Sequence, residues 1–168
     1  MIYLNVQASG LSGSPHPVLH QILTTQDVKK ARSHVKFLCG DVLTGERLHR
    51  DQGISPHCHL CLYLVETTEH VLLHCRSTYE VRERLLTELL NAVAAADPCC
   101  FILTQQATPY FVQFILDCTS LNLPNHFRLS PQNPKTYVVI KTARDWCHGV
   151  LQERGRQLKS LKNIEGEI

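Results

Sequence analysis

The spacing of apolar residues predicts helices along most of the chain. We expect a first helix from Thr24 or Thr25, either of which can cap it, to Gly40, because apolar residues recur there on one stripe. The stripe consists of Val28, Ala31, Val35 and Leu38. Asp27 adds a negative charge where the helix dipole favours one. A shorter helical stretch is expected at 42–49, before Gly53 and Pro56.

A leucine-rich stripe predicts a longer helix after residue 76. Its members are Tyr79, Arg82, Leu85, Leu86, Leu89, Leu90 and Val93. The helix should stop at Asp97-Pro98, because a proline disfavours the helical conformation of the residue before it. We interpret this stripe as part of the hydrophobic core rather than a partner groove.

Two more helices are expected in the second half of the chain. Thr108-Pro109 starts a short apolar one, and Asn133-Pro134 starts a last one over roughly 135–159, with Trp146 as its hydrophobic anchor. One side of this last helix should carry Tyr137, Ile140, Arg144, Cys147 and Leu151. No stretch alternates long enough to require a sheet, so the predicted fold class is mainly α.

Composition places the chain among ordinary globular proteins, with 168 residues, 43% hydrophobic and 19% charged. A membrane-spanning apolar run and the features of a signal peptide are both missing, so we expect an intracellular protein of the nucleus or cytoplasm, with no membrane partner. Disulfides are then not expected. The cysteines outside the motif described next should be free thiols, mostly buried: Cys39, Cys99, Cys100, Cys118 and Cys147.

The densest group of metal-binding residues has the spacing C-x2-C-x8-H-x4-C. It consists of Cys58, Cys61, His70 and Cys75. Two cysteines separated by two residues can direct both thiolates at one ion from a tight turn, and the later His and Cys can supply the other two ligands. This spacing predicts a closed, tetrahedral Cys3His zinc site with a structural role.

Other residues near the motif could also act as ligands. His74 could replace His70, but side chains of adjacent helical residues point about 100° apart, which leaves His74 poorly placed beside Cys75. A catalytic zinc would leave one position to water, whereas four candidates fill the coordination sphere. His57 and His59 are expected on the solvent side. Chance clustering of the four residues and additional ligands at Cys99-Cys100 stay open as alternatives.

The net charge of +2 does not by itself indicate a nucleic-acid partner, but the distribution of basic residues is uneven. A first basic group precedes the motif: Lys29, Lys30, Arg32, Lys36, Arg47 and Arg50. A second follows near the C-terminus: Arg154, Arg156, Lys159 and Lys162. Basic clusters on both sides of a zinc knuckle suit contacts with phosphates, and they are equally consistent with simple solvated faces.

The chain resembles the zinc-binding region downstream of the reverse transcriptase in non-LTR (LINE-type) retrotransposons. The runs that carry this resemblance are His16-Pro-Val-Leu, Asp27-Val-Lys-Lys-Ala-Arg32, Phe37-Leu-Cys-Gly40-Asp-Val-Leu, the Cys58-x2-Cys61 pair and Glu66-Thr-Thr-Glu-His70-Val-Leu-Leu-His-Cys75. A helix rich in arginine and leucine follows the last cysteine, as in that family, with Arg82, Arg84, Leu85 and Leu86. Residues 110–160 are similar to the helical tail of such sequences.

The resemblance implies that Cys58, Cys61, His70 and Cys75 bind zinc, that nearby basic residues lie close to RNA or DNA, and that a reverse transcriptase domain is a possible partner. Two departures matter. Family members often have proline after the last cysteine, where this chain has Arg76. The chain also lacks the Tyr/Phe-x-Asp-Asp motif of a polymerase and any endonuclease constellation, so we expect no enzymatic activity.

The sequence therefore predicts a small Cys3His zinc knuckle between helices, with a helical C-terminal extension. The expected divisions are an irregular leader (1–17), a helical zinc-binding domain (18–96), a helix and proline-containing connection (97–134), and a C-terminal helix and tail (135–168). The expected function is non-catalytic binding of zinc and of RNA or DNA. The alternative is a zinc-stabilised scaffold that binds protein and no nucleic acid.

Overall fold

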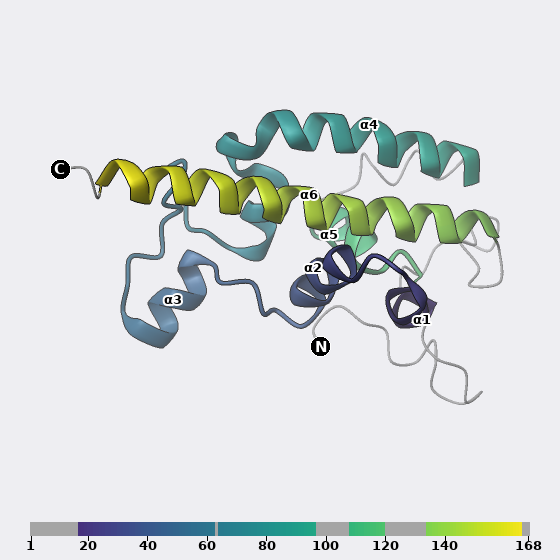
Figure 1. Ribbon diagram of the computed structural model, residues 1–168, viewed down its shortest axis with the longest axis horizontal. Helices are drawn as coiled ribbons and strands as arrows, with labels where there is room; N and C mark the ends of the chain where they lie inside the picture. Colours follow the sequence, from purple (N-terminus) through teal and green to yellow (C-terminus); the bar gives the residue numbers. More distant parts are fainter. Residues whose placement is uncertain (1–16, 63, 97–107, 120–133, 166–168) are drawn as a thin grey trace.

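The computed structural model describes residues 17–62, 64–96, 108–119 and 134–165, and over these ranges the chain is mainly helical (Figure 1). The α-helices are α1 (Pro17–Thr24), α2 (Val28–Leu38), α3 (Gly45–Gln52), α4 (Tyr79–Ala96), α5 (Thr108–Asp117) and α6 (Pro134–Glu165). The β pairing within these ranges is a single bridge between His57 and Val65. The predicted mainly α fold is confirmed. Residues 1–16 of the predicted leader, Cys99 and Cys100 lie outside the described residues.

Helix α6 is the longest helix of the described residues and runs along the long dimension of the molecule (Figure 1). Its 32 residues span about 48 Å. Helix α4 lies along it, while α2, α5 and α1 also contact it. The hydrophobic core contains residues of the predicted segments 18–96, 97–134 and 135–168.

The hydrophobic core is built around Trp146, the anchor predicted for the last helix. Its side chain is 2% exposed, and its ring meets that of Phe111 edge to face, with centroids 6.0 Å apart. The indole Nε1 donates to the carbonyl of Leu72, at 3.3 Å, so the one polar atom of the ring is satisfied. Leu89 of α4 and Phe37 of α2 are also fully buried. Trp146 thus joins α6 to α5 and to the segment that precedes α4.

Helices α4, α5 and α6 agree closely with their predicted patterns. α4 ends at Ala96, before the predicted Asp97-Pro98 stop, and its Leu85, Leu89 and Val93 are buried. α5 begins at Thr108 and α6 at Pro134. Tyr79 and Tyr137 are the exceptions in their stripes, since both are about half exposed in the first turns of their helices.

Helix α2 was predicted, but it begins at Val28, later than the predicted start at Thr24 or Thr25, and two details differ. The N-cap is Asp27 rather than a threonine, because its carboxylate accepts from the backbone N–H of Lys30. Val28 is 71% exposed, and the buried face carries His34 and Phe37 instead. A histidine can occupy this buried face because its Nε2 bonds to the carbonyl of Leu116, at 2.9 Å.

Two short helices differ from expectation. α1 begins with Pro17, which the prediction left in the leader, although proline is favoured in the first turn of a helix. α3 begins at Gly45, later than the predicted residue 42, because the hydroxyl of Thr44 caps it by accepting from the N–H of Arg47. It ends at Gly53, whose φ of 70° is the left-handed conformation that glycine tolerates.

The remaining cysteines and the membrane prediction can be compared directly with the structure. Cys118 and Cys147 are buried free thiols, as expected, whereas Cys39 is exposed because it follows the last turn of α2. In the described ranges, none of the helices combines the length and apolarity needed to cross a membrane.

Candidate metal centre

The first two cysteines of the motif lie in a tight turn between two short antiparallel arms. The arms are held by the N–H of Glu66 donating to Pro56 and that of Cys58 donating to Leu64, at 2.8 and 2.9 Å. The N–H of Leu62 closes the turn by donating to the carbonyl of Cys58, at 2.8 Å. Leu62 has a φ of 58°, an uncommon conformation for a residue with a side chain. The turn folds Cys61 back toward Cys58.

The second pair, His70 and Cys75, flanks a turn of π-helix (His70–His74). The N–H of Cys75 donates to the carbonyl of His70, five residues back, at 2.9 Å. In an α-helix these side chains would point about 140° apart, and the wider turn reduces that divergence. The hydroxyl of Thr67 accepts from the N–H of His70, at 3.0 Å, at the start of this segment. The helix breaks at Cys75 itself, whose extended ψ of 118° precedes a 3-10 turn (Arg76–Thr78).

The four side chains converge on one point. The candidate ligand atoms of Cys58, Cys61, His70 and Cys75 all lie within 4.8 Å of one another. The sulfurs of Cys58 and Cys75 are 3.7 Å apart, and the sulfur of Cys61 is 3.5 Å from Nε2 of His70. A tetrahedral ion about 2.3 Å from sulfur and about 2.0–2.1 Å from nitrogen sets these edges at about 3.8 and 3.5 Å. The cluster is therefore placed to hold a metal ion.

The other histidines near the motif lie outside this cluster. His74, the alternative ligand, is exposed, and its Nε2 lies 3.3 Å from the carboxylate of Glu69. His57 and His59 are exposed, as the sequence predicted. The described structure thus brings His70, and not His74, to the three cysteines.

A buried glutamate supports the cluster from behind and was missed by the sequence analysis as a site residue. Glu66 is 1% exposed, and its Oε1 lies 3.5 Å from the sulfur of Cys58. Arg154 of α6 holds the carboxylate through two hydrogen bonds of 2.9 Å, and the N–H of Gly45 donates to it at 2.7 Å. Burial alone would raise the pKa of Glu66, but the bonds from Arg154 lower it, so the carboxylate is charged.

Gly45 is required where α3 meets the arm of the turn. A Cβ at this position would lie 2.5 Å from the carbonyl oxygen of Pro56, a backbone atom that cannot move aside on its own. The glycine lets the start of α3 approach closely enough for its N–H to reach Glu66. The ligand turn, α3 and α6 therefore meet at one carboxylate.

Arg82 supports the other side of the cluster. This buried residue of α4 donates to the carbonyl of Cys75 and, at 2.6 Å, to the hydroxyl of Thr78. The two bonds fix the 3-10 turn that carries the chain away from Cys75. Partners of this kind orient the ligands of metal sites and are as much a part of the site as the ligands themselves.

The thiols of Cys58 and Cys75 differ in their pKa values. The pKa of Cys58 is raised well above its ordinary value, first by its hydrogen bond to Cys75 and then by burial. The pKa of Cys75 is lowered to about 7, because it accepts that bond. A metal ion would deprotonate both thiols, since thiolates are the binding form.

The six basic residues predicted to contact nucleic acid fall into two sets. Lys30, Arg47 and Arg50 are engaged with carboxylates: Lys30 with Asp145 at 3.1 Å, Arg47 with Asp41 at 2.8 Å and Arg50 with Asp51 at 3.2 Å. Lys29, Arg32 and Lys36 form no ion pair within the part of the chain that the structure describes. The unpaired charges therefore lie on α2.

Fold and site together define a mainly helical protein with a Cys3His cluster suited to a metal ion. No protein-family model matches the chain, and searches of curated proteins and of solved structures found no similar protein. The retrotransposon resemblance thus rests on the sequence motifs and stays a prediction.

Proposed function

We propose that this chain is a non-catalytic zinc-binding module of the type that follows the reverse transcriptase in non-LTR retrotransposons, and that it binds RNA or DNA. The observation that carries the proposal is the Cys3His cluster, whose two measured edges match a tetrahedral ion. The family in this proposal is inferred from the sequence motifs around the cluster.

Zinc is the ion that this ligand set favours. Three thiolates and one imidazole are the soft and borderline ligands of structural zinc, whereas magnesium and calcium prefer oxygen. The cluster supplies four ligands, so no position is left for a reacting water. The role of the ion would be to fix the ligand turn against α3 and α6.

The nucleic-acid part of the proposal is supported by the unpaired basic side chains of α2. Lys29 and Arg32 are exposed and Lys36 is half-buried, and the three residues lie on one face of α2. Lysine and arginine side chains free of carboxylates are the groups that neutralise phosphates and release counterions.

Zinc content tests the first half of the proposal. Protein purified without added metal should contain equimolar zinc, and Cys61→Ser should contain little or none. Cys39→Ser is the matched control, because Cys39 is an exposed free thiol outside the cluster. Equal zinc in the Cys61→Ser variant, or none in the unchanged protein, would contradict the assignment.

Salt-dependent binding tests the second half. Fluorescent single-stranded RNA and DNA should bind the zinc-loaded protein, with an affinity that falls steeply between a low and a high salt concentration. Zinc-loaded protein that binds neither probe would retain the metal site and refute the nucleic-acid role.

A second candidate function, a protein-binding scaffold, is favoured by an apolar groove beside the ligand turn. The groove has a volume of about 740 Å³, and its walls include Leu43, Leu62 and Leu161. All three leucines are exposed, Leu62 to 77%, and grouped exposed apolar side chains are typical of protein-binding surfaces. A scaffold would hold zinc and show no salt-dependent binding of nucleic acid, so the same titration separates the two functions.

A further inference from the structure

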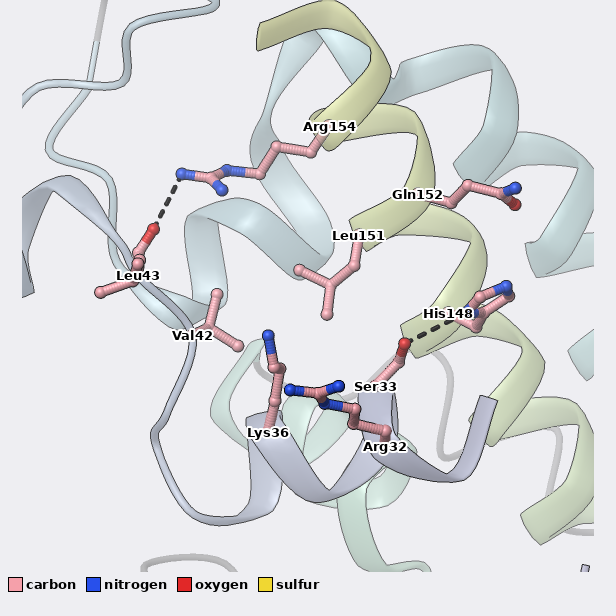
Figure 2. Close-up of a pocket in the computed structure, with 9 residues that line it drawn as sticks. All are labelled: Arg32, Ser33, Lys36, Val42, Leu43, His148, Leu151, Gln152 and Arg154. Atoms are coloured by element: carbon pink, nitrogen blue, oxygen red, sulfur yellow. Dashed lines mark hydrogen bonds between the residues drawn. The ribbon is translucent and has the colours of Figure 1, made fainter. Parts of the chain in front are cut away.

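A cavity of about 540 Å³ lies between α2 and α6, away from the metal ligands. Figure 2 shows Lys36 of α2 and Arg154 of α6 on opposite sides of Leu151 and Val42, while Gln152 points away from them. Its polar lining is Arg32, Ser33 and Lys36 of α2 with His148, Gln152 and Arg154 of α6. The two basic groups of the sequence, more than a hundred residues apart, therefore meet at one cavity.

The charged side chains that line this cavity are all basic. Arg32 and Lys36 are four residues apart on α2, and neither has an acidic partner in the described part of the chain. Like charges at this spacing on a helix repel each other. None of the residues that line the cavity is acidic. A bound anion would relieve the repulsion between the two cations.

Hydrogen-bonding groups are fixed on the α6 side. The hydroxyl of Ser33 lies 3.1 Å from Nδ1 of His148, which ties α2 to α6 across the cavity (Figure 2). Arg154 is held in place by Glu66 and by the carbonyl of Leu43, and its Nη1 makes no hydrogen bond among the described residues. The hydroxyl of Ser33 also donates to the carbonyl of Lys29, at 3.1 Å, so its proton and Nδ1 of His148 are already engaged. Nη1 of Arg154 is therefore the donor that is held in place before a ligand arrives.

We propose that this cavity binds a phosphate group. Cations without acidic partners and fixed donors are the chemistry that recognises phosphate, and the volume lies in the range of ligand pockets, about 300–1,000 Å³. Apolar walls at Val42 and Leu151 suit the sugar attached to the phosphate. The lining contains no Phe, Tyr or Trp on which a base could stack, so recognition is of the phosphate and not of the base sequence.

A phosphate can reach the cavity from two sources: the backbone of a single-stranded nucleic acid, or a free nucleoside phosphate. The first source rests on the proposed function, and the second does not. The test uses the zinc-loaded protein with three probes: a short fluorescent oligouridylate, adenosine monophosphate and inorganic phosphate. Binding of the two small probes is followed by the NMR amide signals of Ser33 and His148.

The decisive variant is Arg32→Gln with Lys36→Gln. Its matched control is Arg84→Gln with Lys141→Gln, which changes the net charge equally at exposed residues of α4 and α6 that do not line the cavity. We expect the cavity variant to bind oligouridylate about tenfold more weakly, with a salt slope lower by about 1.4 for two lost phosphate contacts. The control should bind within about twofold of the unchanged protein, and zinc content with circular dichroism checks the fold of both variants.

The possible results distinguish the phosphate-binding cavity from the proposed nucleic-acid function. If adenosine monophosphate or inorganic phosphate shifts the signals of Ser33 and His148, and the cavity variant abolishes the shifts, the cavity proposal stands even when oligouridylate does not bind and the nucleic-acid function fails. If oligouridylate binds and both double variants weaken it equally, the nucleic-acid function stands and the cavity proposal is overturned. Binding of no probe overturns both.

Discussion

Trp146 and Cys58 are both almost fully buried, but among different neighbours. Trp146 lies in a continuous apolar cluster that joins α6 to α2, α4 and α5. Cys58 is surrounded by the three other candidate ligands and the buried carboxylate of Glu66, and backbone hydrogen bonds hold its turn. The helical core can be stabilised by burial of apolar surface. The knuckle (56–62 and 64–75) contributes Val71 and Leu72 to that core, but the ligand turn within it (56–62 and 64–66) contributes no member of the apolar cluster. We therefore expect the core and the knuckle to be stabilised by different interactions, so that a single change mainly destabilises one of the two regions.

Removal of the metal should give the largest effect, confined to the knuckle. In zinc-finger peptides structural zinc supplies about 10 kcal/mol or more, and here the ligand turn adds no residue to the apolar cluster that could replace the ion. Chelation should raise hydrogen exchange of the knuckle amides strongly, while α4 and the central part of α6 keep their protection. Equal loss of protection in both regions would show that they unfold as one unit.

Truncation of Trp146 should give the converse result. Trp146→Ala removes the largest buried side chain, and we expect a loss of about 3–5 kcal/mol in the free energy of unfolding. Tyr137→Ala, an exposed aromatic residue on the same helix, is the control and should cost less than about 0.5 kcal/mol. Urea titration measures both, and zinc content at low denaturant should stay equimolar. Loss of zinc in the folded Trp146→Ala protein would refute the division.

The pair Glu66 and Arg154 connects the two regions, and its disruption should affect both. Arg154→Met leaves the carboxylate of Glu66 buried without its counter-ion, with an expected cost of about 3 kcal/mol and weaker zinc binding. Arg156→Met is the control, because the side chain of Arg156 is 70% exposed and its ion pair with Glu153 should contribute much less to stability. Glu66→Gln combined with Arg154→Met should recover part of the loss. Additive effects in that double variant would mean that the pair is not coupled.

A mild fall in pH should weaken the core through His34. Burial lowers the pKa of His34 to about 4, against the hydrogen bond to Leu116, which raises it; nearby Arg144 also lowers it and Asp117 raises it. As the pH falls from about 6.5 to about 4, the unfolded chain takes up a proton that the folded imidazole does not. Stability therefore decreases over this window, by at most about 3 kcal/mol.

The measurement is the difference in unfolding free energy between the unchanged protein and His34→Gln at several pH values with saturating zinc. Because the metal ligands titrate in both proteins, the difference isolates His34. An identical profile for His34→Gln and the unchanged protein would exclude His34 as the cause.

Local patterns in the sequence predict those parts of the molecule in which neighbours along the chain determine the structure. The leucine stripe of α4 and the Pro134 start of α6 follow from such patterns. The four members of the metal cluster lie within eighteen residues, so their spacing was sufficient to predict that they meet.

Contacts between distant residues could not be predicted in this way. Glu66 and Arg154 are 88 residues apart, and nothing in the spacing of either one indicates the other. The sequence does indicate that Glu66 lies near the site, because it is an acidic residue five positions after the second cysteine. The resemblance assigns no role to it. His34 was overlooked because polar residues are normally assigned to the solvent face of a helix. The cavity between α2 and α6 depends on the tertiary packing of two helices, and so does its charge.

The central position of α6 has a consequence for the synthesis of the protein. A ribosome makes α1 to α5 and all four members of the metal cluster before it makes Trp146 and Arg154. During that interval the apolar faces of α2 and α4 lack the helix on which they pack, and Glu66 lacks its counter-ion. The nascent chain must therefore keep its thiols reduced and its leucines out of aggregates until α6 emerges, and early zinc capture would protect the cysteines during that delay.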